Sequence, residues 1–212
     1  MLHIRPATPA DVPTILRFIR ELATFEREAD KAVATEADLL RDGWGLNPQG
    51  QPLEPPSPPR FRALIADWPA EPSQPAEPAQ PADSRQLAEP ARLAEPAQPA
   101  KPSQVAEPSQ FAEPAGFALY FTSYSTWVGH HGIRLEDLYV TPERRGQGIG
   151  KVLLATLARL AVDEGCSRLE WDVLTWNDPA IAVYRRLGAT TQEDWRIMRL
   201  SGEGLITLAS KG

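Results

Sequence analysis

Apolar positions with a helical period predict four helices in this chain. The clearest run follows Gly150, where every third or fourth residue is apolar. Its apolar positions are Val152, Leu153, Leu157, Leu160 and Ala161. Residues 8–26 also predict a helix, with Thr8 as the cap and Pro9 at its first position. Residues 35–43 and 177–188 predict two more, which end at Gly43 and Gly188.

Shorter apolar runs between these segments predict strands. They cover residues 2–7, 60–67, 116–126, 132–140 and 167–175, with two further strand-like runs near 195–200 and 205–210. Strands that alternate with helices indicate an α/β protein built in layers. The expectation is a mixed central sheet of about seven strands with four helices.

Proline changes this picture in the middle of the chain. Of 22 prolines, 17 fall between Pro48 and Pro114, and from Ala70 a Pro/Ala/Glu-rich hexad repeats eight times. Such a segment offers little apolar surface, so residues 69–115 are predicted to be disordered or polyproline-like. They lie between the second and third predicted strands. We therefore interpret residues 1–212 as one domain that a low-complexity insert interrupts.

Composition narrows the classes of function. The chain has 212 residues, a formal net charge of −6 and one cysteine, which fits a reducing, cytoplasmic compartment. An acidic chain without a basic stripe argues against nucleic acid as a partner. No uncharged apolar run approaches the length of a membrane span. The three histidines have no metal-ligand spacing, so no metal is expected.

A glycine loop, "ERRGQGIGK" (143–151), is the strongest candidate for chemistry. It does not fit the P-loop or the dinucleotide fingerprint, and its remaining pattern is R-x-x-G-x-G at Arg145, Gly148 and Gly150. The loop lies between a predicted strand and the start of a predicted helix. Free backbone N–H groups there can bind an anion, and glycine allows close approach. The alternative is a flexible helix entry that binds nothing.

These motifs occur together in one known family. The chain resembles the GNAT N-acetyltransferase superfamily, and within it the diamine acetyltransferases of the spermidine/spermine type. The resemblance rests on "LEDLYV" before the glycine loop, "GCSRLEW" after it and "WNDPAI..YRRLGA" further on, and it covers nearly all of the chain outside 69–115. "YSTW" (124–127) is similar to the thialysine branch of this subfamily, where the polyamine branch has "YDPW".

The resemblance implies a GNAT fold, in which acetyl-CoA is the cosubstrate and lies between splayed strands four and five. The implied cofactor-binding residues are Leu138, Tyr139, Val140, Arg145, Gly146, Gln147, Gly148, Ile149, Gly150, Lys151, Glu170, Trp171, Asp172, Asn177, Asp178, Pro179 and Ala180. Tyr184 would be the general acid for the departing thiolate. Glu136 would be the carboxylate that faces the amine, and Phe25, Glu26 and Glu193 would contact the substrate. The family also implies a homodimer.

Elementary chemistry agrees with these roles. A protonated amine must lose a proton before it attacks a thioester, and a carboxylate such as Glu136 can hold the cation and accept that proton. Strand alternation puts Glu136 and Asp137 on opposite faces, so one of the two must face the ligand. The alternatives are a solvent-facing strand position for Glu136 and helix packing for Tyr184.

The expected function is therefore transfer of acetyl from acetyl-CoA to a primary amine of a small molecule. A diamine, a polyamine or a thialysine-like or lysine-like amine would fit. Two alternatives remain open: acetylation of a protein or antibiotic amine, and a scaffold that uses the Pro-rich repeat.

Overall fold

The structure is a computed structural model that describes residues 1–69 and 112–212; most of the predicted insert lies outside these residues. Its contacts divide the chain into two units, Met1–Asp172 and Val173–Gly212. Each unit is described by itself. Within the described residues, no helix is long and apolar enough to cross a membrane.

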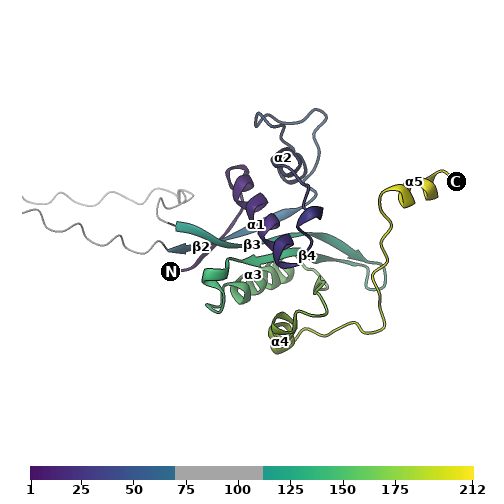
Figure 1. Ribbon diagram of the computed structural model, residues 1–212. Coiled ribbons are helices and arrows are strands. Elements are labelled where there is room, and N and C mark those ends of the chain that lie inside the picture. The colour runs from purple at the N-terminus through teal and green to yellow at the C-terminus, as the bar shows by residue number, and fades with distance from the viewer. Residues whose placement is uncertain (70–111) are drawn as a thin grey trace, which may run out of the picture. The chain divides into compact units, whose positions relative to one another are not determined.

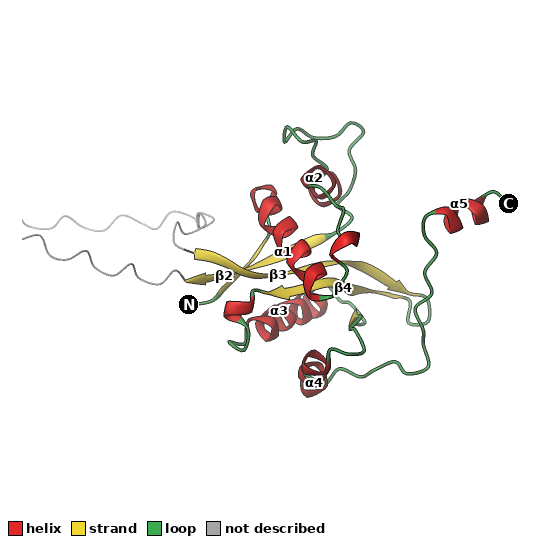
Figure 2. Cartoon of the chain, in the orientation of Figure 1, coloured by secondary structure: helices red, strands yellow, loops and turns green. Residues whose placement is uncertain are grey.

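The first unit is built around a five-stranded sheet in the order β1-β2-β3-β4-β5 (Figures 1 and 2). The strands are β1 (His3–Pro6), β2 (Arg62–Pro69), β3 (Ala112–Ser125), β4 (His130–Val140) and β5 (Leu169–Trp171). Neighbours pair antiparallel except β4 and β5, which are parallel. A mixed sheet is therefore confirmed.

Three helices accompany this sheet. They are α1 (Val12–Phe25), α2 (Glu36–Trp44) and α3 (Ile149–Asp163). The predicted positions of all three are confirmed to within a few residues. Thr35 caps α2 as its hydroxyl accepts a hydrogen bond from the Asp38 N–H, and Gly45 ends that helix with a positive φ of 65°.

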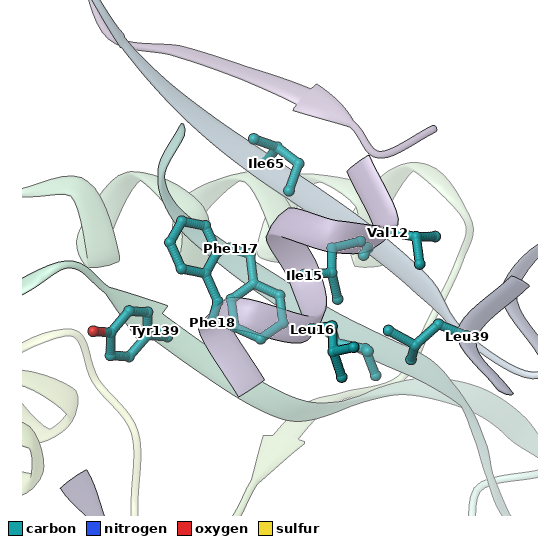
Figure 3. Close-up of a cluster of buried hydrophobic side chains, with 10 residues drawn as sticks. Val12, Ile15, Leu16, Phe18, Leu39, Ile65, Phe117 and Tyr139 are labelled. Atoms are coloured by element: carbon teal, nitrogen blue, oxygen red, sulfur yellow. The ribbon is translucent and has the colours of Figure 1, made fainter. Parts of the chain in front are cut away.

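The main core lies where α1 packs on one face of the sheet. Phe18 of α1 stacks on Phe117 of β3, with ring centroids 5.7 Å apart, and lies 5.5 Å from the ring of Tyr139 in β4. Figure 3 shows Tyr139 at the edge of this cluster, with its hydroxyl oxygen directed away from the other labelled side chains. The ring of Tyr139 thus belongs to the core while its polar end reaches the region of the glycine loop.

The other face of the sheet is covered by α3 (Figure 1). This helix buries the apolar positions that its period predicts, Leu153, Leu157 and Ala161, together with Ile149 and Leu154. Two further positions fit the period but are less buried: Val152 is 40% exposed, and Leu160 is half-buried. Thus α1 and α3 cover opposite faces of the sheet, and the loop that enters α3 starts at the end of β4.

The second unit contains α4 (Asp178–Arg186) and α5 (Glu203–Ala209). The prediction of two strands here is wrong: residues 195–200 have no regular structure, and the run at 205–210 lies mostly in α5. Strands must pair with a neighbour to satisfy their backbone groups, whereas a helix satisfies them locally. The described residues therefore contain five strands and five α-helices, where seven and four were predicted.

The strands beside the insert reach further into it than predicted. β2 continues to Pro69 and β3 begins at Ala112, and these two residues pair with each other. The predicted insert, 69–115, therefore includes strand residues at both of its ends. Residues 70–111 connect two neighbouring ends of an antiparallel hairpin.

Candidate active site

The glycine loop joins the end of β4 to α3, as the pattern predicts. Gly146 and Gly148 have positive φ angles of 77° and 83°, and a Cβ at either position would meet no atom within 4 Å. Gly148 is the N-cap of α3 and no side chain caps the helix there. The first N–H groups of a helix have no acceptor within it. The loop therefore has backbone donors on an open surface, and these fit a phosphate group.

Next to this loop, β4 runs beyond its neighbour. β5 pairs with β4 only at Ile133, Arg134 and Leu135, so residues 136–140 of β4 have no partner in β5. This is the expected divergence of strands four and five. The backbone at Leu138, Tyr139 and Val140 lies on the diverging part, next to the start of the glycine loop.

The carboxylate of Glu170 in β5 and that of Asp172, which follows β5, both have polar partners. Ser123 donates to Glu170 Oε1 at 3.2 Å, and Arg168 forms an ion pair with the other oxygen at 3.1 Å. Arg134 of β4 forms an ion pair with Asp172. The contact of Ser123 joins β3 to β5, and that of Arg134 joins β4 to the end of β5. Trp171, between the two carboxylates, is half-buried.

A β-bulge interrupts β4 at Glu136. Leu119 of β3 pairs with Asp137, but the next residue, Tyr120, pairs with Leu135, so Glu136 is the extra residue. Directly paired residues share a face of the sheet. Leu119 belongs to the core under α1, so Asp137 lies on the α1 face. Glu136 is exposed.

The bulge places three carboxyl groups near one another. Burial and, to a smaller extent, the negative charges of Glu136 and Glu26 together raise the pKa of Asp137 to about 7. Burial and the charge of Glu28 also raise the pKa of Glu26, at the end of α1. Two of the predicted carboxylates, Glu26 and Glu136, are thus brought together around Asp137, which the sequence interpretation named only as the neighbour of Glu136 on the opposite face.

Arg145 connects the glycine loop to the end of α1. Its guanidinium carbon lies 4.9 Å from the ring centroid of Phe25 and 5.6 Å from that of Tyr139. Its Nε donates to the Val140 carbonyl at 3.1 Å. Burial and the nearby Glu21 carboxylate raise the pKa of Tyr139 to about 12. These residues border a cavity of about 470 Å³ between α1 and the end of β4.

The remaining predicted residues belong to the second unit. Asn177 caps α4, its Oδ1 accepting from the Ala180 N–H at 3.3 Å, with Asp178 and Pro179 in the first turn. Tyr184 lies in α4, and burial raises its pKa. Glu193 lies in the exposed segment after α4. Their roles at the site, like those of the loop residues, stay predictions.

Comparison with known proteins decides the family. The model of the acetyltransferase (GNAT) family matches residues 63–189, which include β4, the glycine loop and α4. The chain belongs to the GNAT family. It is an acetyltransferase, and members of this family take the acetyl group from acetyl-CoA. Within the part of the chain that the structure describes, no group of three or more His, Cys, Asp or Glu side chains could hold a metal ion.

Curated relatives of this GNAT protein match along nearly its whole length. It is 35% identical to the thialysine N-epsilon-acetyltransferase of Sus scrofa, over 98% of this chain and 97% of the relative. It is 31% identical to an L-ornithine N5-acetyltransferase of Arabidopsis thaliana, over 96% of this chain and 86% of that protein. The resemblance to the diamine-type and thialysine-type acetyltransferases is thereby confirmed.

Solved structures agree on the fold. An integron cassette protein from the mobile metagenome of V. cholerae superposes with a TM-score of 0.60 at 20% identity, covering 98% of this chain and 97% of that one. An aminoglycoside acetyltransferase from a soil metagenome gives a TM-score of 0.58 at 15% identity, covering 95% and 99%. At these identities the likeness shows the fold alone.

Proposed function

We propose that this protein transfers the acetyl group of acetyl-CoA to a side-chain primary amine of a small amino acid or diamine. Thialysine and L-ornithine, which the names of two relatives give as substrates, are the first amines to consider. Both carry a cationic amine at the end of a short chain. Lysine and spermidine share this chemistry.

The glycine loop and the free edge of β4 would hold acetyl-CoA. N–H groups from Gly146 to Lys151 would donate to its pyrophosphate, and the backbone of Leu138, Tyr139 and Val140 would follow its pantetheine arm. Glu170 to Asp172 and Asn177 to Ala180 would line the opposite side. Acetyl-CoA supplies an activated acyl group, and these residues orient it.

The acidic cluster would bind and deprotonate the amine. Glu26 and Glu136 would hold the cation near Asp137, and a carboxyl group with a pKa of about 7 is matched to accept a proton at neutral pH. Glu136 and Asp137 are therefore the two candidates for the base, acting directly or through water. Phe25 and Glu193 would also contact the amine, and Tyr184 would give a proton to the departing thiolate.

The observation that supports this function most is the position of Asp137, near the two carboxylates of Glu26 and Glu136 and directly before the part of β4 that would hold the thioester. The experiment is turnover of acetyl-CoA with a panel of thialysine, L-ornithine, L-lysine and spermidine. CoA release and mass spectrometry of the product would identify the acetylated amine. Release of CoA no faster than in a control without amine, for all four compounds, would contradict the proposal.

A further inference from the structure

Two neighbouring arginines of the glycine loop stack on aromatic rings from different elements. Arg145 lies over Phe25, the last residue of α1, and over Tyr139 of β4. Arg144 lies over Trp68 of β2, with its guanidinium carbon 5.1 Å from the ring centroid. Each distance is within the range of about 6 Å over which a cation and an aromatic face attract. The loop is thus connected to α1 by one arginine and to β2 by the other.

The contact of Arg145 joins two regions with different proposed ligands. On one side, Arg145 directly precedes the glycines whose N–H groups would hold the phosphates of acetyl-CoA. On the other side, Phe25 precedes Glu26, which belongs to the acidic cluster around Asp137. The hydrogen bond from Arg145 Nε to the Val140 carbonyl restricts the guanidinium from a third direction. A ligand that contacts Arg145 therefore acts on the end of α1 through the ring of Phe25.

We propose that the stack of Arg145 on Phe25 couples the two substrate sites, so that acetyl-CoA and the amine each strengthen the binding of the other. This inference rests on the proposed function. The reason for the positive sign is conformational entropy: the first ligand orders the loop and the end of α1, so the second ligand binds a region that is already ordered. Phe25 is in this respect a positioning residue, in addition to any contact that it makes with the amine.

The test measures the coupling factor, which is the affinity of one ligand with the other present divided by its affinity alone. Isothermal titration of thialysine into the protein, with and without saturating CoA, gives this factor without turnover. We expect at least about fivefold coupling in the wild-type protein, the lower end of the usual range for linked sites. The reverse titration, CoA with and without thialysine, must give the same factor because the linkage is reciprocal.

The decisive variant is Phe25→Leu. Leucine keeps an apolar helix-forming side chain at a position that is 39% exposed, but it removes the aromatic face. The coupling factor should fall to about 1, whatever happens to the affinity of thialysine alone. Arg145→Lys is a second route to the same result, since lysine keeps the charge and loses the planar stacking group.

Trp68→Leu is the matched control. It removes the ring beneath Arg144, the neighbouring arginine of the same loop, but it leaves the connection to α1 in place. It should leave the coupling factor at the wild-type value, even where it weakens CoA binding. Circular dichroism would establish that each variant is folded before titration.

Three results would overturn the coupling but not the proposed function. They are a wild-type coupling factor of about 1 or below, an unchanged coupling factor in Phe25→Leu, or a loss of coupling in Trp68→Leu equal to that in Phe25→Leu. Failure of the proposed function gives a different result: the wild-type protein would bind no CoA or acetylate no amine. That result would overturn the proposed function and the coupling together.

Discussion

Asp137 of β4 lies directly opposite Leu119 of β3, on the sheet face that α1 covers. This pairing exists because of the bulge at Glu136. Without the extra residue, Asp137 would lie on the same face as Ile133 and Leu135, under α3. The bulge therefore turns a carboxyl group from the interior under α3 towards the end of α1, where Glu26 lies.

The first prediction concerns the pH dependence that this carboxyl group produces. The pKa of Asp137 is raised to about 7, so below this pH the group is mostly protonated and cannot accept a proton from the amine. kcat/KM should therefore fall as the pH decreases through about 7. Asp137→Asn should remove this limb and lower kcat/KM by about 10²- to 10⁴-fold, the usual range for a positioned base. A pH–rate profile of each protein measures both effects.

Glu136→Gln separates the two candidate bases. The negative charge of Glu136 raises the pKa of Asp137, so its removal should lower that pKa and move the acidic limb to lower pH. If Glu136 is the base itself, Glu136→Gln will instead abolish the limb and most of the activity, while Asp137→Asn will retain them. The two variants thus have opposite signatures.

Local sequence patterns predicted much of the fold. The periods of α1 and α3, the cap at Thr35 and the strand before the glycine loop are properties of short segments, and all were predicted. The bulge at Glu136 was not, because it is defined by the pairing of β4 with β3, which no local pattern contains. The position of Asp137 near Glu26 was not predicted for the same reason, because regular alternation would place Asp137 on the other face of the sheet.

The end of the chain shows a second limit of local patterns. The apolar run at 205–208 fits a strand or a helix equally well by composition, and short runs are ambiguous in this way. Gly202 begins the segment with a φ of 55°, and the following residues form α5. Whether such a run becomes a strand depends on a neighbouring strand, which the sequence of the run does not contain.

The glycine loop gives a second prediction. Gly148→Val should weaken CoA binding by about tenfold or more, because a branched side chain disfavours the left-handed backbone at φ 83° and covers the open donors. Calorimetry measures this affinity. Gly129→Val is the matched control: Gly129 also has a positive φ, 71°, and open space around it, but it lies in the turn between β3 and β4. Equal affinities in the two variants would contradict the assignment of the loop.

The third prediction concerns the insert. Pro69 and Ala112 are paired residues of neighbouring strands, so an Asn-Gly turn can replace residues 70–111 and close the hairpin. Because loop length changes stability only slowly, the melting temperature should stay within about 4 °C of the full-length protein. The rate of acetylation should also be retained. A decrease of about 10 °C or more would mean that the insert packs against the sheet.

The last prediction concerns Tyr184 of α4. Expulsion of the CoA thiolate is easier when a proton arrives as the carbon–sulfur bond breaks, and a tyrosine hydroxyl is protonated at neutral pH. Burial raises the pKa of Tyr184 above its ordinary value, so the proton remains on the hydroxyl over the whole working range of pH. Tyr184→Phe keeps the ring and removes this proton. It should lower kcat by about 10²- to 10⁴-fold and leave CoA affinity and melting temperature nearly unchanged.

Tyr120→Phe is the control for this experiment. Burial raises the pKa of Tyr120 as well, but this residue lies in β3 beside Arg62, outside the proposed site. Its loss of a hydroxyl should leave kcat unchanged, so an effect confined to Tyr184→Phe reports on proton donation and not on the general loss of a buried hydroxyl. The comparison requires that chemistry limits the rate, which a single-turnover measurement establishes. If Tyr184→Phe then keeps nearly full kcat, Tyr184 is a packing residue of α4 and the thiolate receives its proton from another group.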